Sequence, residues 1–514
     1  MTRQTIGLRV AIATAALVGL LFSLPVRAET ASAEQPALIL NDLGTIDFPN
    51  DGAEGAQQAF LTGVKALYSF EFDEATDAFR IAQAADPDFA MAYWGEAMSY
   101  NHALWQETDP DAAHSVLNKF APSPKARQAK TPAGIQRGLM GAVDTLFGDG
   151  DKLTRDTAYS KAMQDLHETY PDDNEVAALY SLSLLGTVRQ GDSGVGRQMR
   201  AAAIAQSVFT KNPNHPGAAH FIIHALDDPE HAILALPAAR TYAGIAPDAP
   251  HALHMPSHIF VQLGMWEDVV SSNIESYEAA VDIAVKNNME RGRSEFHSLS
   301  WLLYGQTQLG NFSEAKAALQ LAQKTEKDSP TRRVHNGAMA MLARYVVETE
   351  KWDELADFSS EEKNYANLDL QFALGLSAAK RGDIDKAKDA ASRLNALREK
   401  TEARANGAYR AKIIAVSELE VEAAIATAQN DMDTAEELLK NAVAIEATLN
   451  APSGPPVPMK PSFEMYGEFL LAAGRTSEAA EQFAHSLMRT PNRTKSVNGL
   501  NKAKQNAMDT AALP

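Results

Sequence analysis

Similar segments recur along the chain, and each has the pattern of two short helices joined by a turn. Examples of the turn are LGNFSEA at 309–315, RGDIDKA at 381–387 and AGRTSEA at 473–479. Each turn places glycine and a polar residue just before a new run of helix-forming residues, as expected between antiparallel helices. Alternation typical of strands is scarce. The sequence therefore predicts an all-α solenoid built from helical hairpins.

The segment 59–88 shows this pattern in most detail. Small residues, an aromatic residue and a closing proline recur at the offsets of one repeat, namely Gly63, Ala75, Phe79, Ala82 and Pro87. Small side chains let two helices approach closely, and proline ends the second helix. The segment resembles the tetratricopeptide repeat, and the resemblance covers most of 58–510. It implies a tetratricopeptide-type α-solenoid, an architecture that usually binds other proteins.

The pattern divides the chain into four parts. We predict a signal peptide at 1–28, an extended leader at 29–57, an N-terminal repeat array at 58–350 and a C-terminal array at 351–514. Residues 106–140 have the composition of a loop-rich insertion, and the proline-rich segment 451–461 that of a rigid connection before the last repeat.

The first residues have the features of a secretory signal. A basic start with Arg3 and Arg9 precedes an apolar run, which ends in the small-residue pattern Val26-Arg27-Ala28. We expect cleavage near Ala28–Glu29, because the apolar run is short for a membrane anchor. The mature chain would then be exported, to a periplasm or beyond the cell, with no membrane span.

The amino-acid composition excludes some metal ligands and argues against one class of partner. The chain has no cysteine, so thiolate ligands and disulfides are excluded, and any metal must be held by nitrogen, oxygen or methionine sulfur. The formal net charge is −19, and cleavage of the signal would make it −22. Such a charge repels phosphate backbones, which argues against a nucleic-acid partner.

Six of the thirteen histidines lie in two short segments, HPGAAHFIIH at 215–224 and HALHMPSHIF at 251–260. His220 and His224 are four residues apart, as are His254 and His258, and the two pairs are offset by 34 residues. Residues four apart on a helix share one face. An offset of one repeat places the pairs at equivalent positions of successive hairpins, and the family resemblance implies that these positions face the concave groove.

We therefore predict a metal site in which the two pairs face each other. Neighbouring helices pack about 8–10 Å apart, and metal–imidazole bonds are about 2 Å long, so the rings can share one ion or two close ions. His251 and His297 align at the second position of their repeats and should flank the same groove. His215 precedes Pro216 and is expected at a helix cap. The predicted ligands are His215, His220, His224, His251, His254, His258 and His297.

Pro256 constrains the second pair. A proline inside a helix costs about 3 kcal/mol, so we expect a helix that starts near His254, with His251 before it. If two ions bind, the ligands fall into two sets of three in chain order, His215, His220 and His224, then His251, His254 and His258. Glu96, Glu230 and Tyr304 are candidates for supporting groups. The roles of His102 and His231 stay open.

The histidine motifs HPGxxHxxxH and HMPSH also resemble those of exported bacterial tetratricopeptide proteins, a resemblance that implies no activity. Histidines without thiols in an oxidising compartment favour copper, with zinc or iron as alternatives. Such a site is compatible with oxidase or hydrolase chemistry, but whether the protein is an enzyme stays open. The alternative is a metal-free scaffold that binds a peptide, a protein or a small molecule in its concave groove.

Overall fold

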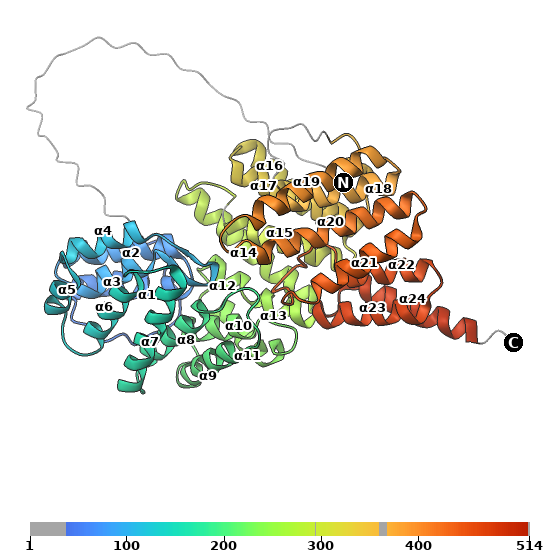
Figure 1. Ribbon diagram of the computed structural model, residues 1–514. Coiled ribbons are helices and arrows are strands. Elements are labelled where there is room, and N and C mark those ends of the chain that lie inside the picture. The colour runs from blue at the N-terminus through green and yellow to red at the C-terminus, as the bar shows by residue number, and fades with distance from the viewer. Residues whose placement is uncertain (1–37, 293, 359–366, 512–514) are drawn as a thin grey trace, which may run out of the picture. The chain divides into compact units, whose positions relative to one another are not determined.

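The computed structural model describes residues 38–292, 294–358 and 367–511 of the 514 residues. Helices account for nearly all regular structure in these ranges, and consecutive helices pack against each other as antiparallel pairs (Figure 1). The prediction of an all-α, tetratricopeptide-type solenoid is confirmed. The predicted signal peptide, its cleavage site and the start of the leader lie outside the described residues.

The order of elements follows the repeated hairpins. The first part of the chain contains α1 (Glu54–Tyr68), α2 (Phe72–Ala85), α3 (Ala90–Met98), β1 (Asn101–His102), η1 (Ala103–Trp105), β2 (Glu107–Thr108), α4 (Pro110–Phe120), α5 (Pro124–Lys130), α6 (Ile135–Leu146), α7 (Lys152–Thr169), α8 (Asn174–Gly186) and α9 (Gly196–Lys211). The middle part contains α10 (Pro216–Ala225), α11 (Ala232–Ile245), α12 (Pro250–His254), α13 (Pro256–Leu263), α14 (Trp266–Lys286), α15 (Ser294–Gln308), α16 (Phe312–Asp328) and α17 (Arg332–Thr349).

The last part contains η2 (Trp352–Leu355), α18 (Leu368–Arg381), α19 (Ile384–Glu402), α20 (Ala408–Ala428), α21 (Met432–Glu446), α22 (Ser462–Ala472), α23 (Thr476–Arg489) and α24 (Thr494–Ala511). The short strands β1 and β2 pair antiparallel, with Asn101 opposite Thr108.

An aromatic ring held between two glycines sets the helix spacing at the start of the solenoid. A β-carbon on Gly63 of α1 would lie 2.8 Å from the ring of Phe79, and one on Gly95 of α3 would lie 2.2 Å from it. Only glycine therefore fits on either side of this ring. The same arrangement recurs around Phe483 near the other end, where β-carbons on Gly467 and Gly499 would lie 3.0 and 2.4 Å away.

The segment 38–53 has no helix, yet it is part of the core. Leu40, Leu43 and Phe48 are buried, and α1 begins at Glu54, within the range assigned to the leader. The backbone N–H of Thr45 donates to the carbonyl of Asn214, just before α10.

The loop-rich interpretation of 106–140 was wrong, because α4, α5 and the start of α6 lie there. Asp109 and Ser123 cap α4 and α5 by accepting hydrogen bonds from backbone N–H groups three residues on. A proline follows each cap, at the first helical position, where its missing N–H has no consequence.

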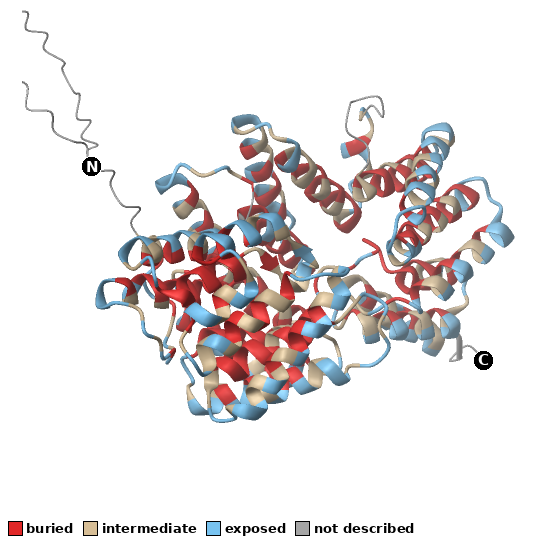
Figure 2. Ribbon diagram, turned by 60° about the vertical axis from the view of Figure 1, so that its left-hand side comes forward, coloured by how far each residue is buried: buried red, intermediate tan, exposed pale blue. Residues whose placement is uncertain are grey.

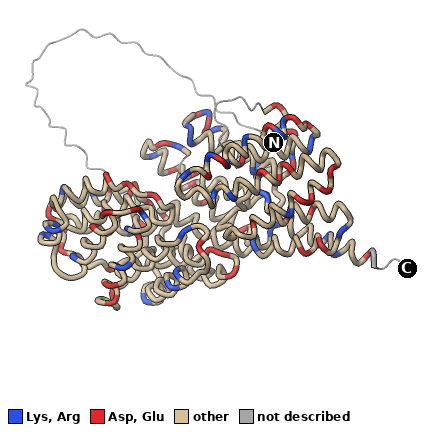
Figure 3. The backbone as a smooth tube through the Cα atoms, in the orientation of Figure 1, with Lys and Arg blue, Asp and Glu red and all other residues tan. Residues whose placement is uncertain are grey.

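Buried residues lie on the faces that the helices turn toward one another (Figure 2). Two large apolar clusters result, one extending from Leu40 to Tyr304 and the other from Phe296 to Ala503. The histidine segments belong to the first cluster. Acidic and basic residues are distributed along the described chain rather than gathered in one block (Figure 3). Within the described ranges, no helix has the length and hydropathy needed to cross a membrane.

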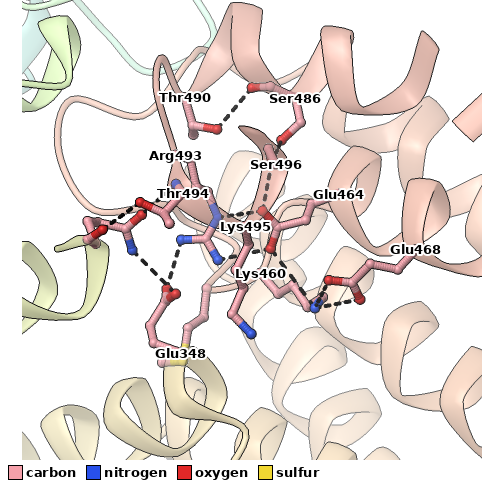
Figure 4. Close-up of polar contacts among 12 residues, drawn as sticks. Glu348, Lys460, Glu464, Glu468, Ser486, Thr490, Arg493, Thr494, Lys495 and Ser496 are labelled. Carbon is pink, nitrogen blue, oxygen red and sulfur yellow. Dashed lines mark hydrogen bonds and ion pairs between the residues drawn. The ribbon is translucent and has the colours of Figure 1, made fainter. Parts of the chain in front are cut away.

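A buried ion-pair cluster joins the last repeat to the middle of the chain (Figure 4). The guanidinium of Arg493 makes two hydrogen bonds to Glu464 of α22, at 2.8 and 3.0 Å, and one to Glu348 of α17 at 2.9 Å. Arg493 also donates to the Tyr304 hydroxyl of α15 at 3.4 Å. All of these side chains are buried, so the contacts hold α22 and α24 against α15 and α17.

Candidate metal centre

The predicted histidines come from the first helices of three consecutive hairpins. His220 and His224 lie on α10, His251 and His254 on α12, and His258 on α13. His297 lies on α15, the first helix of the next hairpin. The second helices, α11 and α14, separate these first helices along the chain, while α10 contacts α13 and α12 contacts α15. The 34-residue offset therefore places the rings on neighbouring helices, as expected.

A helix does start near His254, as predicted, because α13 begins at Pro256, but the expectation that His251 precedes the helical region was wrong. Helix α12 begins at Pro250, and Pro256 separates it from α13, with Met255 between them in a helical conformation. Both prolines stand in a first turn, where no N–H is required. His251 is therefore helical, and its backbone N–H donates to the Glu71 carboxylate at 2.9 Å.

His220, His224 and His251 form the first group of rings, which we call triad 1. One nitrogen from each ring lies within 4.8 Å of the other two. The centroid of the His220 ring is 4.7 Å from that of His224 and 5.0 Å from that of His251. Phe70, which follows α1, covers this triad with its ring centroid 4.3 Å from that of His220.

His254, His258 and His297 form the second group, triad 2, which meets the same 4.8 Å criterion. The His254 centroid is 5.1 Å from that of His258 and 4.3 Å from that of His297. The indole of Trp301 lies over this triad, 4.5 Å from the His258 ring. Each triad is thus covered by one aromatic side chain.

The two triads are copies of one arrangement, displaced by one hairpin. Each consists of a histidine pair from one first helix and a histidine from the start of the next first helix. The grouping expected from chain order was therefore wrong, because His251 completes the earlier pair and His297 the later one. At position 217, one repeat before His251, stands Gly217, where a β-carbon would lie 3.0 Å from the Tyr68 ring.

His215 belongs to neither triad. It caps α10, where its Nδ1 accepts a hydrogen bond from the Ala218 N–H at 3.1 Å. Its Nε2 lies 3.4 Å from the Glu175 carboxylate. The expectation of a helix cap was correct.

The triads also lie next to each other. The ring centroids of His224 and His258 are 5.9 Å apart, and those of His251 and His254 are 6.2 Å apart. These separations match the longest one within a triad, 6.3 Å between His224 and His251. Two ions held by the two triads would therefore be close neighbours.

Hydrogen bonds to oxygen fix the orientation of three rings. The Nδ1–H of His220 donates to the Tyr68 carbonyl, and that of His254 donates to the Asn273 side-chain oxygen. The Nδ1–H of His258 donates to the Asp227 carboxylate. Each of these hydrogen bonds is 2.7 Å long. In each ring the second nitrogen, Nε2, then keeps its lone pair. Metal-binding histidines show this arrangement, which fixes the tautomer and the ring orientation.

Four of the Nε2 atoms lack hydrogen-bond partners among the described residues. In the described part of the chain, the Nε2 atoms of His220, His224, His251 and His254 are buried and accept or donate no hydrogen bond. A buried polar atom without a partner costs about 1–3 kcal/mol. Ions bound by the triads would give these four Nε2 atoms a partner.

The electrostatics favour neutral rings. Burial, with neighbouring imidazoles as the second cause, lowers the pKa of His224, His251 and His254 well below the usual value. Burial also lowers the pKa of His220 to about 3 and that of His297 to about 4. The His297 residue is exposed at the edge of the cluster, so solvent weakens the effect there. Neutral imidazoles are the form that binds metal.

The donor set fits a metal ion. Metal–nitrogen bonds of about 2.0–2.1 Å hold three imidazole nitrogens roughly 3.3 Å apart, so small ring movements would close each triad. His220 and His254 are 0% and 1% exposed, and this burial is deeper than expected for residues lining an open concave groove. The cluster is largely buried, and one side of it adjoins a cavity.

A cavity of about 400 Å³ forms that side. Its lining includes His251, His254 and His297, together with the aromatic residues Phe70, Phe72 and Trp105. His102, whose role the sequence left open, also lines it and stacks on Phe72 at 4.1 Å. His231 is bonded to Asp228 and lies outside the cavity lining.

The supporting residues were not found from the sequence. Glu96 is bonded to Arg80, and the Tyr304 hydroxyl accepts a hydrogen bond from Arg493. Glu230 lies in the turn after α10. The residues that orient the rings are Tyr68, Asp227 and Asn273. Asp227 lies close to His224 in sequence, but it bonds His258, which is 31 residues away.

Comparisons with known proteins add little. No protein-family model matches the chain, and no curated protein matches its sequence. Solved structures with some likeness include Cut9–Hcn1 of the APC/C, with 14% identity over 89% of this chain and 78% of that chain and a TM-score of 0.35. Yeast Tom70 has 12% identity over 89% and 90%, with a TM-score of 0.35. The TPR domain of P58(IPK) has 13% identity over 89% and 99%, with a TM-score of 0.21. Superpositions this loose say nothing about metals, substrates or partners.

Proposed function

We propose that the protein is a metalloprotein that holds two ions, one in each histidine triad. The observation that carries this proposal is the set of six imidazoles, three of them oriented through Nδ1 and four with buried Nε2 atoms that have no partner among the described residues. A metal-free cluster would leave these nitrogens unsatisfied, and protonation would bring like charges together.

Copper is the favoured metal, with zinc and iron as alternatives. The ligands are imidazoles alone and thiolates are absent, a combination suited to copper in an oxidising compartment. We further propose that the chain is exported to a periplasm or beyond, on the basis of the signal-like residues 1–28. Two adjacent three-histidine sites have the ligand count of coupled dicopper centres, as an analogy of ligand chemistry on a different fold.

Such a centre would activate oxygen or water, and we propose oxidase or hydrolase activity on that basis. The chain itself contributes binding and shielding. Phe70 and Trp301 cover the two triads, and the cavity of α2, η1, α12 and α15 gives a ligand access to His251, His254 and His297.

The alternative is a metal-free scaffold. A tetratricopeptide-type solenoid supports a role in protein interaction, and a partner in its groove would need no metal. The two proposals differ in what the purified protein contains.

Elemental analysis of the natively exported protein separates them. We expect two ions per chain, and we expect His220→Ala combined with His254→Ala to lose them, because each change removes a ligand from one triad. His335→Ala is the matched control, since this histidine pairs with Glu326 outside both triads. Metal-free protein whose melting temperature is unchanged by Cu(II), Zn(II) or Fe(II) would support the scaffold instead.

A further inference from the structure

The cavity beside the triads has an aromatic wall with an exposed tryptophan. Phe70 and Phe72 stack with their ring centroids 5.4 Å apart, and Trp105 meets them edge-on at 5.4 and 6.1 Å. Trp105 is 48% exposed, although it lies on the short helix η1 next to this apolar cluster. A large aromatic side chain left open at a cavity is typical of a ligand-binding surface.

The backbone of this wall is unusual. Phe70 has a φ of 58°, in the left-handed region that a bulky side chain rarely adopts. This conformation costs about 1–3 kcal/mol, and such residues cluster at functional sites. It places the Phe70 ring between triad 1 and the cavity, 5.7 Å from the centroid of His251.

The charge of the cavity lining is strongly one-sided. The acidic residues that line it are Glu71, Asp73, Glu74, Glu107, Glu290 and Glu295. Arg333 is the only lysine or arginine among the lining residues that the structure describes. Glu295 is paired with Arg291, but carboxylates still outnumber basic groups in the lining, so the cavity favours cations over anions.

A ligand in this cavity would reach unsatisfied nitrogen atoms. His254 is 1% exposed, and its Nε2 has no partner among the described residues, yet the residue lines the cavity. His251 lines it in the same way and lies 6.0 Å from Trp105, between ring centroids. The cavity therefore leads from an aromatic, acidic opening to the histidine cluster.

We infer that this cavity binds a small organic cation, an aliphatic or aromatic ammonium, with its charge against the aromatic wall and the carboxylates. Cation–π contact with tryptophan and charge attraction favour the same ligand class. As the substrate class of the metal centre, this inference rests on the proposed function, whereas binding itself does not require metal.

The test is isothermal titration calorimetry of the purified full chain with three probes of similar size. Benzyltrimethylammonium carries a fixed charge and has no lone pair for a metal, benzyl alcohol is neutral, and benzenesulfonate is an anion that binds metals weakly. We expect one cation per chain, bound about tenfold more tightly than benzyl alcohol, and no binding of benzenesulfonate. Equal affinity for the three probes would overturn the inference.

Substitutions then locate the site. Trp105→Ala, and separately Glu74→Gln combined with Glu290→Gln, should each weaken cation binding about fivefold or more. The matched controls are Phe312→Ala and Glu314→Gln, which replace exposed residues of α16 outside the cavity and should change nothing. Cation binding that ignores both cavity variants would place the site elsewhere and contradict the inference.

Metal analysis of the same samples separates the two proposals. Two ions per chain without cation binding would overturn the inference and leave the metal centre standing. Cation binding by a metal-free chain would support the cavity and contradict the metal centre.

Discussion

At the proposed metal centre, Asp227 orients one of the histidine rings. One carboxylate oxygen accepts the Nδ1–H of His258 at 2.7 Å, and the other accepts a hydrogen bond from Gln262 at 3.1 Å. The carboxylate therefore holds the His258 ring in one tautomer and one direction. A carboxylate in this position also raises the basicity of the imidazole as a metal ligand.

Asp227→Asn should therefore lower metal affinity about 10–100-fold while leaving the helical content unchanged. The change keeps the size of the side chain but removes the charge that orients the ring. The neighbouring Asp228 offers a matched control, because it bonds His231 outside the triads. Metal titration against a competing chelator measures both variants. Equal affinities for the two variants would show that Asp227 has no role in metal binding.

At the residue scale, the sequence predicted which histidines lie together better than it predicted the residues around them. Six of the seven predicted histidines lie together. This was predictable because the spacing of residues along a repeat fixes their positions on neighbouring helices. The partners of the rings were missed because they are distant in sequence. Tyr68 is 152 residues from His220, and Asn273 is 19 residues from His254. Nothing local marks such a contact.

At the scale of the elements, helix packing depends on glycines that face aromatic rings. Gly95→Ala would place a β-carbon where the Phe79 ring lies, so we expect a loss of about 1–3 kcal/mol in the free energy of unfolding. Gly55→Ala is the control, since nothing lies within 4 Å of that position, and alanine is the better helix former. Urea unfolding of both variants measures the difference. Equal stability would show that the rings adjust freely.

The division between α12 and α13 was predictable only in part. Pro256 signals an interruption, but the sequence could not say that Pro250 starts an earlier helix. A short helix before a proline needs tertiary contacts, here the bond from the His251 N–H to Glu71. That contact makes His251 helical and available to triad 1.

At the scale of the whole described unit, Arg493 connects repeats that are distant in sequence. Arg493→Met should lower the free energy of unfolding by about 3–5 kcal/mol, because Glu464 and Glu348 would stay buried without their partner. Arg475→Met is the control, since Arg475 is 34% exposed and pairs with Glu436 and Glu478 near the surface. We expect a much smaller loss there, because solvent screens these pairs. Chemical denaturation measures the free energy of unfolding of both variants. A similar loss in both would contradict a stabilising role for the buried ion pairs of Arg493.

The same cluster predicts a dependence on pH. Burial alone would raise the pKa of Glu464, but Arg493 and Lys460 outweigh it and hold the pKa below its ordinary value of 4.5. The stability that ionised Glu464 contributes is present above that value and is lost as the pH falls through the folded-state pKa. Glu464→Gln should thus be less stable than the wild type at pH 7, with a difference that shrinks below about pH 4.5. A difference independent of pH would contradict this.

The proline-rich segment 451–461 contacts residues around the proposed metal centre. A β-carbon on Gly454 would lie 2.5 Å from the Trp301 indole, which covers triad 2. The Pro452 carbonyl also accepts a hydrogen bond from Gln262, the residue that supports Asp227. The sequence predicted a rigid connection here but gave no sign of what it covers, since the hydrogen bond from Gln262 to Pro452 joins residues 190 positions apart.

Anomalous X-ray diffraction at the absorption edge of the metal found in the purified protein tests the central claim most directly. We predict two peaks, one about 2.0–2.1 Å from nitrogens of His220, His224 and His251, and the other at the same distance from nitrogens of His254, His258 and His297. Crystals of metal-loaded protein with no peak among these six rings would contradict the claim.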